Sequence, residues 1–334
     1  MTAVLEPVSP PVFRFKKMAS SSRSPDRGSV QQVAVKALQT RSVKVERLDG
    51  SVFRSFRLQP QSDFFYVLRC RPSSHVRLLR HEEERLQAEA IVLQTLRGRP
   101  DLLIPRLIEY NKTTHPLGSQ YLINGPFKGS ILSDVEPDLS TQALASIDRS
   151  LGQYVRQLAQ VTGPAFGPTR GTTPPTNPTT WSHTFTTLLE SALRDGEDAL
   201  ISLPYDFIRS QARRHRGALD QITTPRLTIL EMSADKNIVV DTDHNVVSGV
   251  LDVSTAIWGD PFLSDCFCRP SVGFAEGFGR LPRGDEGERC RQYLYVLYHS
   301  LLAVVRQCYR PSEEGDEMGA RRNLTAALTR LGGI

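Results

Sequence analysis

The sequence lacks the long hydrophobic runs and regular cysteine patterns of membrane or disulfide-rich proteins. No stretch reaches the roughly 18 apolar residues that a membrane-spanning helix needs. The best candidate, residues 294–305, is shorter and contains His299 and Ser300. The five cysteines are an odd number at irregular spacings. We therefore expect free, buried thiols in a reducing compartment, a cytoplasmic location and no membrane association.

Clustered charge and paired histidines are also missing. Lys and Arg outnumber Asp and Glu by 41 to 36, but they form no basic helix interleaved with aromatic residues. We therefore expect no nucleic-acid partner. The seven histidines show no spacing typical of a metal site or a nucleophile triad. The 334 residues, 39% of them hydrophobic, suffice for one large domain or two lobes and indicate no oligomeric state.

Residues 1–38 show no hydrophobic period. Prolines, serines and scattered charges dominate, as in the string from Ala19 to Ser29. Arginines among serines also occur in transit peptides, but Glu6, Asp26 and the prolines argue against one here. We predict a disordered N-terminal tail over residues 1–38.

Residues 39–125 are predicted to form a small β-rich lobe. Apolar and polar residues alternate over 42–72, with turn residues near Asp49 and Pro60, which indicates a β-meander. A helix is predicted next, because its leucines fall on one face. The helix and the two strands after it are expected at residues 76–97, 107–110 and 121–123.

Residues 126–334 are predicted to form a mainly helical lobe that carries one β-hairpin. The hairpin strands are expected at 238–240 and 246–251. Asn237 stands just before the first strand and Asp252 just after the second, so the hairpin brings an amide and a carboxylate together. Such a pair suits a hard cation such as Mg²⁺, although both residue types also cap ordinary turns. Helices are expected at 144–158, 181–193, 207–219, 293–305 and 323–331.

The order of motifs in the second lobe resembles the aminoglycoside-phosphotransferase-like family, which has the protein-kinase-like fold. The motifs are LTILEMSADKNIVV at 227–240, GVLD at 249–252 and WGDP at 258–261. The run at 151–167, LGQYVRQLAQVTGPAFG, resembles the fungal and actinobacterial branch of that family. The resemblance covers roughly residues 40–310. It implies an α+β, two-lobed protein-kinase-like fold with a small β-rich N-lobe and a mainly helical C-lobe.

The resemblance also implies a nucleotide site that uses ATP and Mg²⁺. Asn237 and Asp252 would hold the metal against the ATP phosphates. Arg69 stands where the family usually has a phosphate-binding lysine, and Glu89 on the following helix would be its partner. A structural ion pair between these two residues is the alternative to a phosphate clamp.

Two further cofactor contacts follow from the same resemblance. Gly50 and Ser51 would lie in the loop over the phosphates. Residues 121–125, with Ile123 at the centre, would form the hinge beside adenine.

The family's His-x-Asp pair is absent. Aligned from the left of the motif, the catalytic aspartate becomes Glu231; aligned without a gap from Asn237, it becomes Met232. We take Glu231 as the candidate base, with a non-catalytic residue as the alternative. Glutamate reaches one methylene further than aspartate, and a misplacement of roughly 1 Å can cost about 100-fold in rate.

Two function classes follow. One is an ATP- and Mg²⁺-dependent phosphotransferase that acts on a small-molecule hydroxyl, in the setting of specialised metabolism. The other is a catalytically impaired pseudokinase that binds a nucleotide, a metabolite or a partner. A kinase-like scaffold reused for another reaction is a third reading that rests on analogy alone.

Overall fold

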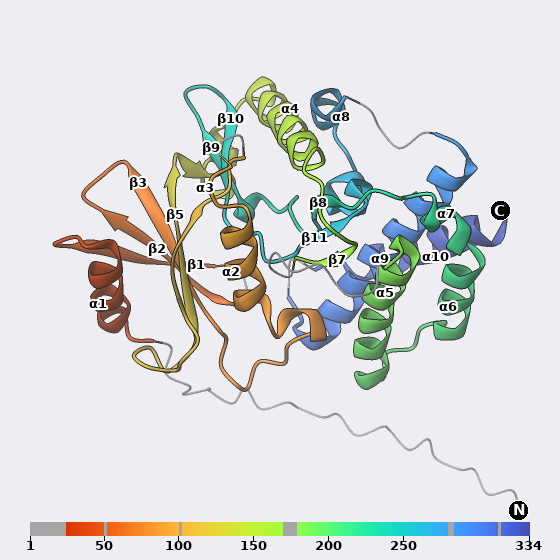
Figure 1. The fold of residues 1–334 in the computed structure, drawn as a ribbon, viewed down its shortest axis with the longest axis horizontal. Helices are drawn as coiled ribbons and strands as arrows, with labels where there is room; N and C mark the ends of the chain where they lie inside the picture. The colour runs from red at the N-terminus through yellow and green to blue at the C-terminus, as the bar shows by residue number, and fades with distance from the viewer. Residues whose placement is uncertain (1–24, 50–51, 100–101, 170–178, 280–283, 313–314) are drawn as a thin grey trace, which may run out of the picture.

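A computed structural model describes residues 25–49, 52–99, 102–169, 179–279, 284–312 and 315–334. It has the two lobes of a protein-kinase-like fold, with the small β-rich lobe at the left of Figure 1 and the helical lobe at the right. The N-lobe is built on an antiparallel five-stranded sheet in the order β1-β2-β3-β5-β4. Its strands are β1 (Val43–Leu48), β2 (Arg54–Pro60), β3 (Phe64–Cys70), β4 (Arg106–Asn111) and β5 (Tyr121–Lys128).

One face of this sheet is covered by a helix that the sequence did not predict. Helix α1 (Arg27–Leu38) packs Val30 and Ala34, both fully buried, against the sheet in one apolar cluster that includes Leu58 and Leu68. The predicted disordered tail therefore does not extend to residue 38. Residues 1–24 lie outside the described part of the chain.

The opposite face of the sheet carries helix α2 (Arg85–Thr95), preceded by a short 3₁₀ turn at Arg80–Glu82. The predicted helix over 76–97 is therefore shorter than expected. Because side chains alternate along a strand, neighbouring residues of β5 belong to different cores. Leu122 packs in the cluster that contains α2, whereas Ile123 packs in the cluster that contains α1.

The chain crosses between the lobes within and just after β5. This strand runs to Lys128, so the predicted lobe boundary after residue 125 falls inside it. Strand β6 (Ser130–Ile131) then joins the hairpin in a second sheet, in the order β10-β9-β6. Gly129 at this crossing has a φ of +110°, and a Cβ there would overlap the carbonyl oxygen of Val240. The close approach of the two lobes thus requires a residue without a side chain.

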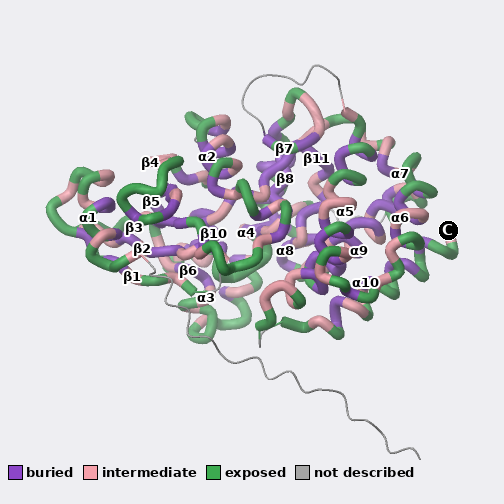
Figure 2. Tube along the Cα trace, turned by 90° about the horizontal axis from the view of Figure 1, so that it is seen from below, coloured by how far each residue is buried: buried purple, intermediate pink, exposed green. Residues whose placement is uncertain are grey.

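The C-lobe is helical, and its core forms where α5 and α9 face each other. Trp181 donates from Nε1 to the Tyr295 hydroxyl at 2.7 Å, and Phe185 packs beside both rings. Figure 2 shows buried residues along the inner sides of both helices. The C-lobe helices are α3 (Leu132–Val135), α4 (Thr141–Leu158), α5 (Trp181–Asp198), α6 (Tyr205–Arg214), α7 (Arg216–Asp220), α8 (Val272–Phe278), α9 (Glu286–Tyr309) and α10 (Glu317–Gly332).

The predicted hairpin is present as β9 (Ile238–Asp241) and β10 (Val246–Val250). The stretches on either side of the hairpin also contain strands. These are β8 (Arg226–Ile229) and β11 (Ala256–Gly259), which pair with each other, and β11 also pairs with β7 (Gly167–Pro168). Strand β8 leads directly into the segment 230–237, and β11 follows Asp252 closely. This small sheet therefore positions both halves of the candidate site.

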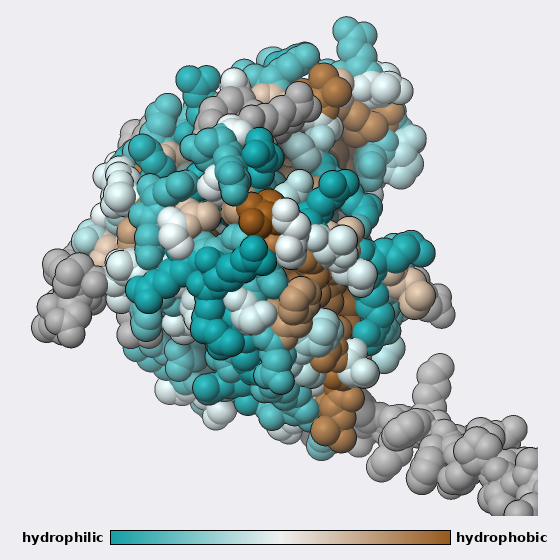
Figure 3. Space-filling view, turned by 90° about the vertical axis from the view of Figure 1, so that its right-hand side faces the viewer, coloured by the Kyte–Doolittle hydropathy of each residue, from teal (hydrophilic) through white to brown (hydrophobic). Residues whose placement is uncertain are grey.

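The surface and the cysteines are ordinary for a globular chain. The face seen in Figure 3 is mainly hydrophilic and is crossed by a narrow hydrophobic strip. Among the described residues, no helix combines the length and the apolar character needed to cross a membrane. All five cysteines are free, and three of them are buried.

We predict that the packing of α1 stabilises the N-lobe. Val30→Ala removes two buried methyl groups, so it should lower the free energy of unfolding by about 2 kcal/mol. Gln32→Ala, at an exposed position of the same helix, should change it by less than about 0.5 kcal/mol. Urea denaturation of the full chain measures both values. Equal losses in the two variants would contradict the packing of α1 on the sheet.

Candidate functional site

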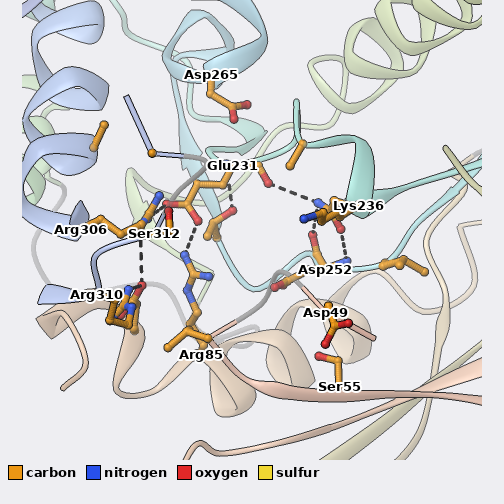
Figure 4. A pocket seen from close by; sticks show the side chains of 18 of the residues that line it. Asp49, Ser55, Arg85, Glu231, Lys236, Asp252, Asp265, Arg306, Arg310 and Ser312 are labelled. Atoms are coloured by element: carbon orange, nitrogen blue, oxygen red, sulfur yellow. Dashed lines mark hydrogen bonds and ion pairs between the residues drawn. The ribbon is translucent and has the colours of Figure 1, made fainter. Parts of the chain in front are cut away.

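A cavity of about 660 Å³ lies between the two lobes. Figure 4 shows charged side chains pointing into it from the N-lobe, from the segment 230–237 and from the end of α9. The wall combines basic and acidic groups at close range. Its charged residues are Asp49, Arg69, Glu82, Arg85, Glu231, Lys236, Asp252, Asp265, Arg306, Arg310, Asp316 and Glu317.

Arg69 and Glu89 form the ion pair that the sequence indicated. Arg69 Nε lies 3.0 Å from Glu89 Oε2, a second guanidinium nitrogen contacts the other carboxylate oxygen, and both side chains are almost fully buried. Arg69 also donates to the carbonyl oxygen of Leu251 at 2.8 Å. Asn124 donates to Glu89 Oε1 at 2.8 Å and to the same carbonyl at 3.2 Å. The network thus fastens β3, β5 and α2 to the residue that precedes Asp252.

The hairpin brings Asn237 and Asp252 together. The Asp252 backbone N–H donates to Asn237 Oδ1 at 2.7 Å, and Asn237 Nδ2 donates to the Asp252 carbonyl at 3.3 Å. Burial raises the pKa of the Asp252 carboxyl, but nearby Arg69 and Arg85 outweigh burial, so the pKa is lowered overall. Asp252 is therefore an ionised carboxylate on the cavity wall.

The residues present fit a magnesium ion that arrives together with a phosphate. Within the described residues no group of three histidine, cysteine or acidic side chains could hold a metal alone. Asp252 supplies one carboxylate, and Asn237 supplies an amide oxygen that already accepts one hydrogen bond. Mg²⁺ commonly binds through one or two carboxylates and takes its other ligands from water and substrate phosphate. A bound ion would neutralise phosphate charge beside Asp252.

Glu231 lies between two arginines. Its carboxylate forms ion pairs with Arg85 and Arg306, as Figure 4 shows, and His81 Nε2 lies 3.9 Å away. Although burial raises the pKa of Glu231, Arg306 and Arg85 hold it well below its usual range. Burial lowers the pKa of His81 to about 4, so the imidazole is neutral at neutral pH. A carboxylate so strongly acidic and paired twice is a weak proton acceptor.

The ion pairs continue from Glu231 across the lobe interface. Arg310 Nη2 lies 2.6 Å from Glu82 Oε1, and Arg306 Nε lies 3.8 Å from the same oxygen. Arg310 also donates to the Arg77 carbonyl at 2.7 Å. Sequence reasoning assigned no role to Arg85, Arg306 or Arg310. Arg306 lies in the last turn of α9 and Arg310 directly follows the helix, and this spacing of four residues is a signal that could have found that pair.

The residue that the gap-free alignment puts at the catalytic position is turned away from the cavity. Met232, the residue of the gap-free alignment, is only 1% exposed and packs in the C-lobe core. Asp265 accepts hydrogen bonds from the backbone N–H groups of Met232 and Ser233 at 2.9 and 3.0 Å, so it organises this loop. Asp260 has a similar role in its own loop, where it accepts from Phe262 N at 3.1 Å and from the Tyr295 hydroxyl at 2.8 Å.

The structure leaves two of the predicted cofactor contacts untested and places the third away from the cavity. Gly50 and Ser51 lie outside the described residues. Ile123 is fully buried on the face of the sheet that packs against α1, so it points away from the cavity that it was predicted to line. The pleat of β5 is the physical reason, since it turns Asn124 toward the cavity side and Ile123 away from it.

No protein-family model and no curated protein matches the sequence. Solved structures do match its fold. A provisionally assigned fructosamine-3-kinase from Thermobifida fusca aligns with a TM-score of 0.63 at 14% identity, over 90% of this chain and 99% of that chain. A provisionally assigned aminoglycoside phosphotransferase from Ralstonia eutropha gives 0.56 at 13% identity, over 90% and 97%. The GDP complex of aminoglycoside 2'-phosphotransferase-IIIa gives 0.56 at 15% identity, over 91% and 99%.

These likenesses define the class of fold to which the chain belongs. It has the two-lobed architecture shared by protein kinases and the small-molecule phosphotransferases, and the resemblance noted in the sequence is confirmed at the level of fold. Sequence identities of 13–15% extend the likeness no further than architecture.

We predict that Glu231 contributes stability through its two arginine partners. Glu231→Gln removes the carboxylate partner of Arg85 and the nearer of the two carboxylate partners of Arg306. It should cost about 2 kcal/mol at pH 7, between the values typical of exposed and buried pairs. The folded-state pKa of Glu231 is lowered, so its contribution is fully present above the unfolded value of about 4.3 and is lost as the pH falls through the folded value. Denaturant unfolding from pH 7 to pH 3 measures the difference.

The matched control is Glu276→Gln, which removes an exposed ion pair with Arg149 whose side chains are 48% and 51% exposed. It should cost less than about 1 kcal/mol. A Glu231→Gln cost that stays constant across this pH range would contradict the ion-pair origin of the stability.

Proposed function

We propose that this protein is a pseudokinase, which binds a magnesium-complexed, phosphate-bearing small molecule between its lobes without transferring phosphate efficiently. The observation that carries the proposal is the pairing of Glu231 with both Arg85 and Arg306. This pairing engages the carboxylate of Glu231, the residue that aligns with the catalytic aspartate of the family.

The support for ligand binding comes from the other half of the site. Asp252 is ionised and half-buried on the wall of the cavity. A hydrogen bond from the Asp252 backbone N–H to Asn237 Oδ1 holds the two residues together. The network of Arg69 and Glu89 fixes the N-lobe above them. Rigidly placed oxygen ligands beside a charged cavity favour a metal-bound phosphate. The likeness to a phosphotransferase solved with GDP supports the same ligand chemistry.

The support for impaired transfer comes from the cost of freeing Glu231. Phosphoryl transfer to a hydroxyl requires a group that accepts the hydroxyl proton within hydrogen-bond reach. To do so, Glu231 would have to leave both arginines. Because the pKa of Glu231 is low, transfer of the hydroxyl proton to its carboxylate is unfavourable. Met232 carries no acceptor and is buried.

The second candidate function is an ATP- and Mg²⁺-dependent phosphotransferase that acts on a small-molecule hydroxyl. The observation that favours it is that Glu231 lines the cavity together with Asp252 and Asn237. In phosphoryl transfer, catalysis comes mainly from positioning and charge neutralisation. An acceptor that displaced one arginine from Glu231 would restore a proton-accepting carboxylate.

We predict that magnesium and a phosphate ligand stabilise the wild-type chain together. A ligand at 100 times its dissociation constant should add about 2.7 kcal/mol of stability. Asp252→Asn, which keeps the shape but removes the charge, should abolish the magnesium-dependent part. Thermal unfolding with ATP, GTP and tripolyphosphate, each with and without Mg²⁺, measures this effect.

The control for this titration is Asp243→Asn, in the exposed turn of the same hairpin, which should keep the full shift. A shift of equal size in Asp252→Asn would show that the metal site has been misplaced. No shift with any of the three ligands would remove the binding half of the proposal.

We predict that wild-type protein releases phosphate from Mg²⁺-ATP, with water as acceptor, no faster than Asp252→Asn does. The reason is that two arginines hold the Glu231 carboxylate and keep its pKa low, so it accepts the proton of the attacking oxygen poorly. A sensitive phosphate-release assay compares wild type, Asp252→Asn and Glu231→Gln. Turnover in the wild type that both substitutions abolish would establish the phosphotransferase reading instead.

A further inference from the structure

The junction between β5 and the hairpin is filled by the protein's own aromatic side chains. Phe127, near the end of β5, is 3% exposed and stacks on Phe65 of β3, with ring centroids 5.2 Å apart and planes 27° apart. The two strands remain paired at this point, with Phe65 opposite Phe127. The two rings therefore stack across neighbouring strands that remain paired with each other.

The hairpin closes the other side of these rings. Val239 of β9 and Leu251 after β10 belong to the same buried cluster as Phe65 and Phe127, and each is at most 4% exposed. At Gly249 of β10, a Cβ would come within 3.1 Å of the Phe127 ring. The Phe127 ring therefore lies directly against the hairpin backbone, with no gap between the lobes at this place.

The cavity stops at the edge of this aromatic cluster. Its wall includes Val67 and Leu251 from the rim of the cluster, but the residues that line it include none from β5 or β9. Leu48, which packs against the cluster, and Val52 line the cavity as well, and the rest of its wall is rich in charged groups, including Asp252, Lys236 and Arg85. The open space is thus placed beside ionic groups and not beside the strand that was predicted to contact adenine.

A nucleobase needs a different environment from a phosphate chain. Pockets for flat aromatic groups have apolar walls with a few placed polar contacts, and stacking typically contributes about 1–3 kcal/mol per base. The apolar surface next to β5 is already covered by Phe65 and Phe127. The charged remainder suits phosphate oxygens and a metal ion.

We propose that the ligand of this cleft is a compact, magnesium-bound phosphate chain that carries no nucleobase. Phe127 occupies the position beside β5 that a base would take, while Asp252 and Asn237 hold the phosphate-bound metal. This assignment rests on the proposed function, which supplies the metal-bound phosphate. It adds the class of molecule, and it makes Phe127 the residue that excludes nucleotides.

Calorimetric titration of the full chain with Mg²⁺ and either tripolyphosphate or ATP tests the assignment. We expect tripolyphosphate to bind as tightly as ATP or more tightly, since the base and ribose add no contact. ATP binding that is tighter by about tenfold or more would overturn the assignment, while leaving the proposed function in place. If neither ligand bound, the proposed function itself would fail.

A substitution at Phe127 tests the mechanism of exclusion. Phe127→Ala opens the space beside β5, so the dissociation constant for Mg²⁺-ATP should fall by about tenfold or more, with that for tripolyphosphate unchanged. Phe127→Leu is the milder variant if the alanine variant does not fold. Phe274→Ala is the matched control, because this ring is equally buried, at 3% exposure, in α8 of the C-lobe. Unchanged ATP affinity in a folded Phe127 variant would contradict the role of Phe127.

Discussion

The chemistry of the cavity depends on the pairing of one carboxylate with two guanidinium groups. Arg85 begins α2 of the N-lobe, Arg306 lies near the end of α9 in the C-lobe, and Glu231 stands between them after β8. The two ion pairs of Glu231 therefore fix both the relative position of the lobes and the conformation of the segment 230–237. Removing one member of a buried ion pair typically costs about 3–5 kcal/mol. A movement of Glu231 away from its arginines during catalysis would break the same contacts and lose part of this free energy. The same contact that stabilises the closed arrangement thus opposes proton transfer.

Local patterns in the sequence were enough to predict most strands and helices of both lobes. Alternation defined β1 to β3, and the apolar stripe defined α2, because these signals depend only on neighbouring residues. The pairing of Asn237 with Asp252 was also predictable, since a single hairpin joins them. Arg69 and Glu89 could be matched because a strand and the helix that packs on it face each other. In each case the contact follows from one element or from two adjacent elements.

The parts that could not be predicted depend on contacts between distant segments. Glu231 meets Arg85 and Arg306 across 146 and 75 residues of sequence, and no local pattern links them. Helix α1 follows a stretch rich in serine and proline, and it presents only a few buried residues, such as Val30 and Ala34. A short helix of this kind gains its stability from the sheet it covers rather than from its own sequence. Ile123 was misplaced because a shift of one residue along β5 reverses the face on which a side chain lies.

Under the proposed function, the charges around the cavity give a reason why a phosphate ligand would bind together with a metal ion. Arg85 and Arg306 share the single carboxylate of Glu231, and Glu82 pairs with Arg310. Asp252 then presents its ionised carboxylate to the cavity, and a phosphate chain placed beside it would be repelled. A divalent cation between the Asp252 carboxylate and the phosphate chain would attract both groups. A base would find no such compensation, because the Phe127 ring already covers the apolar surface beside β5. Affinity in this cleft should therefore follow the charge of the metal–phosphate complex and not the identity of an attached nucleoside.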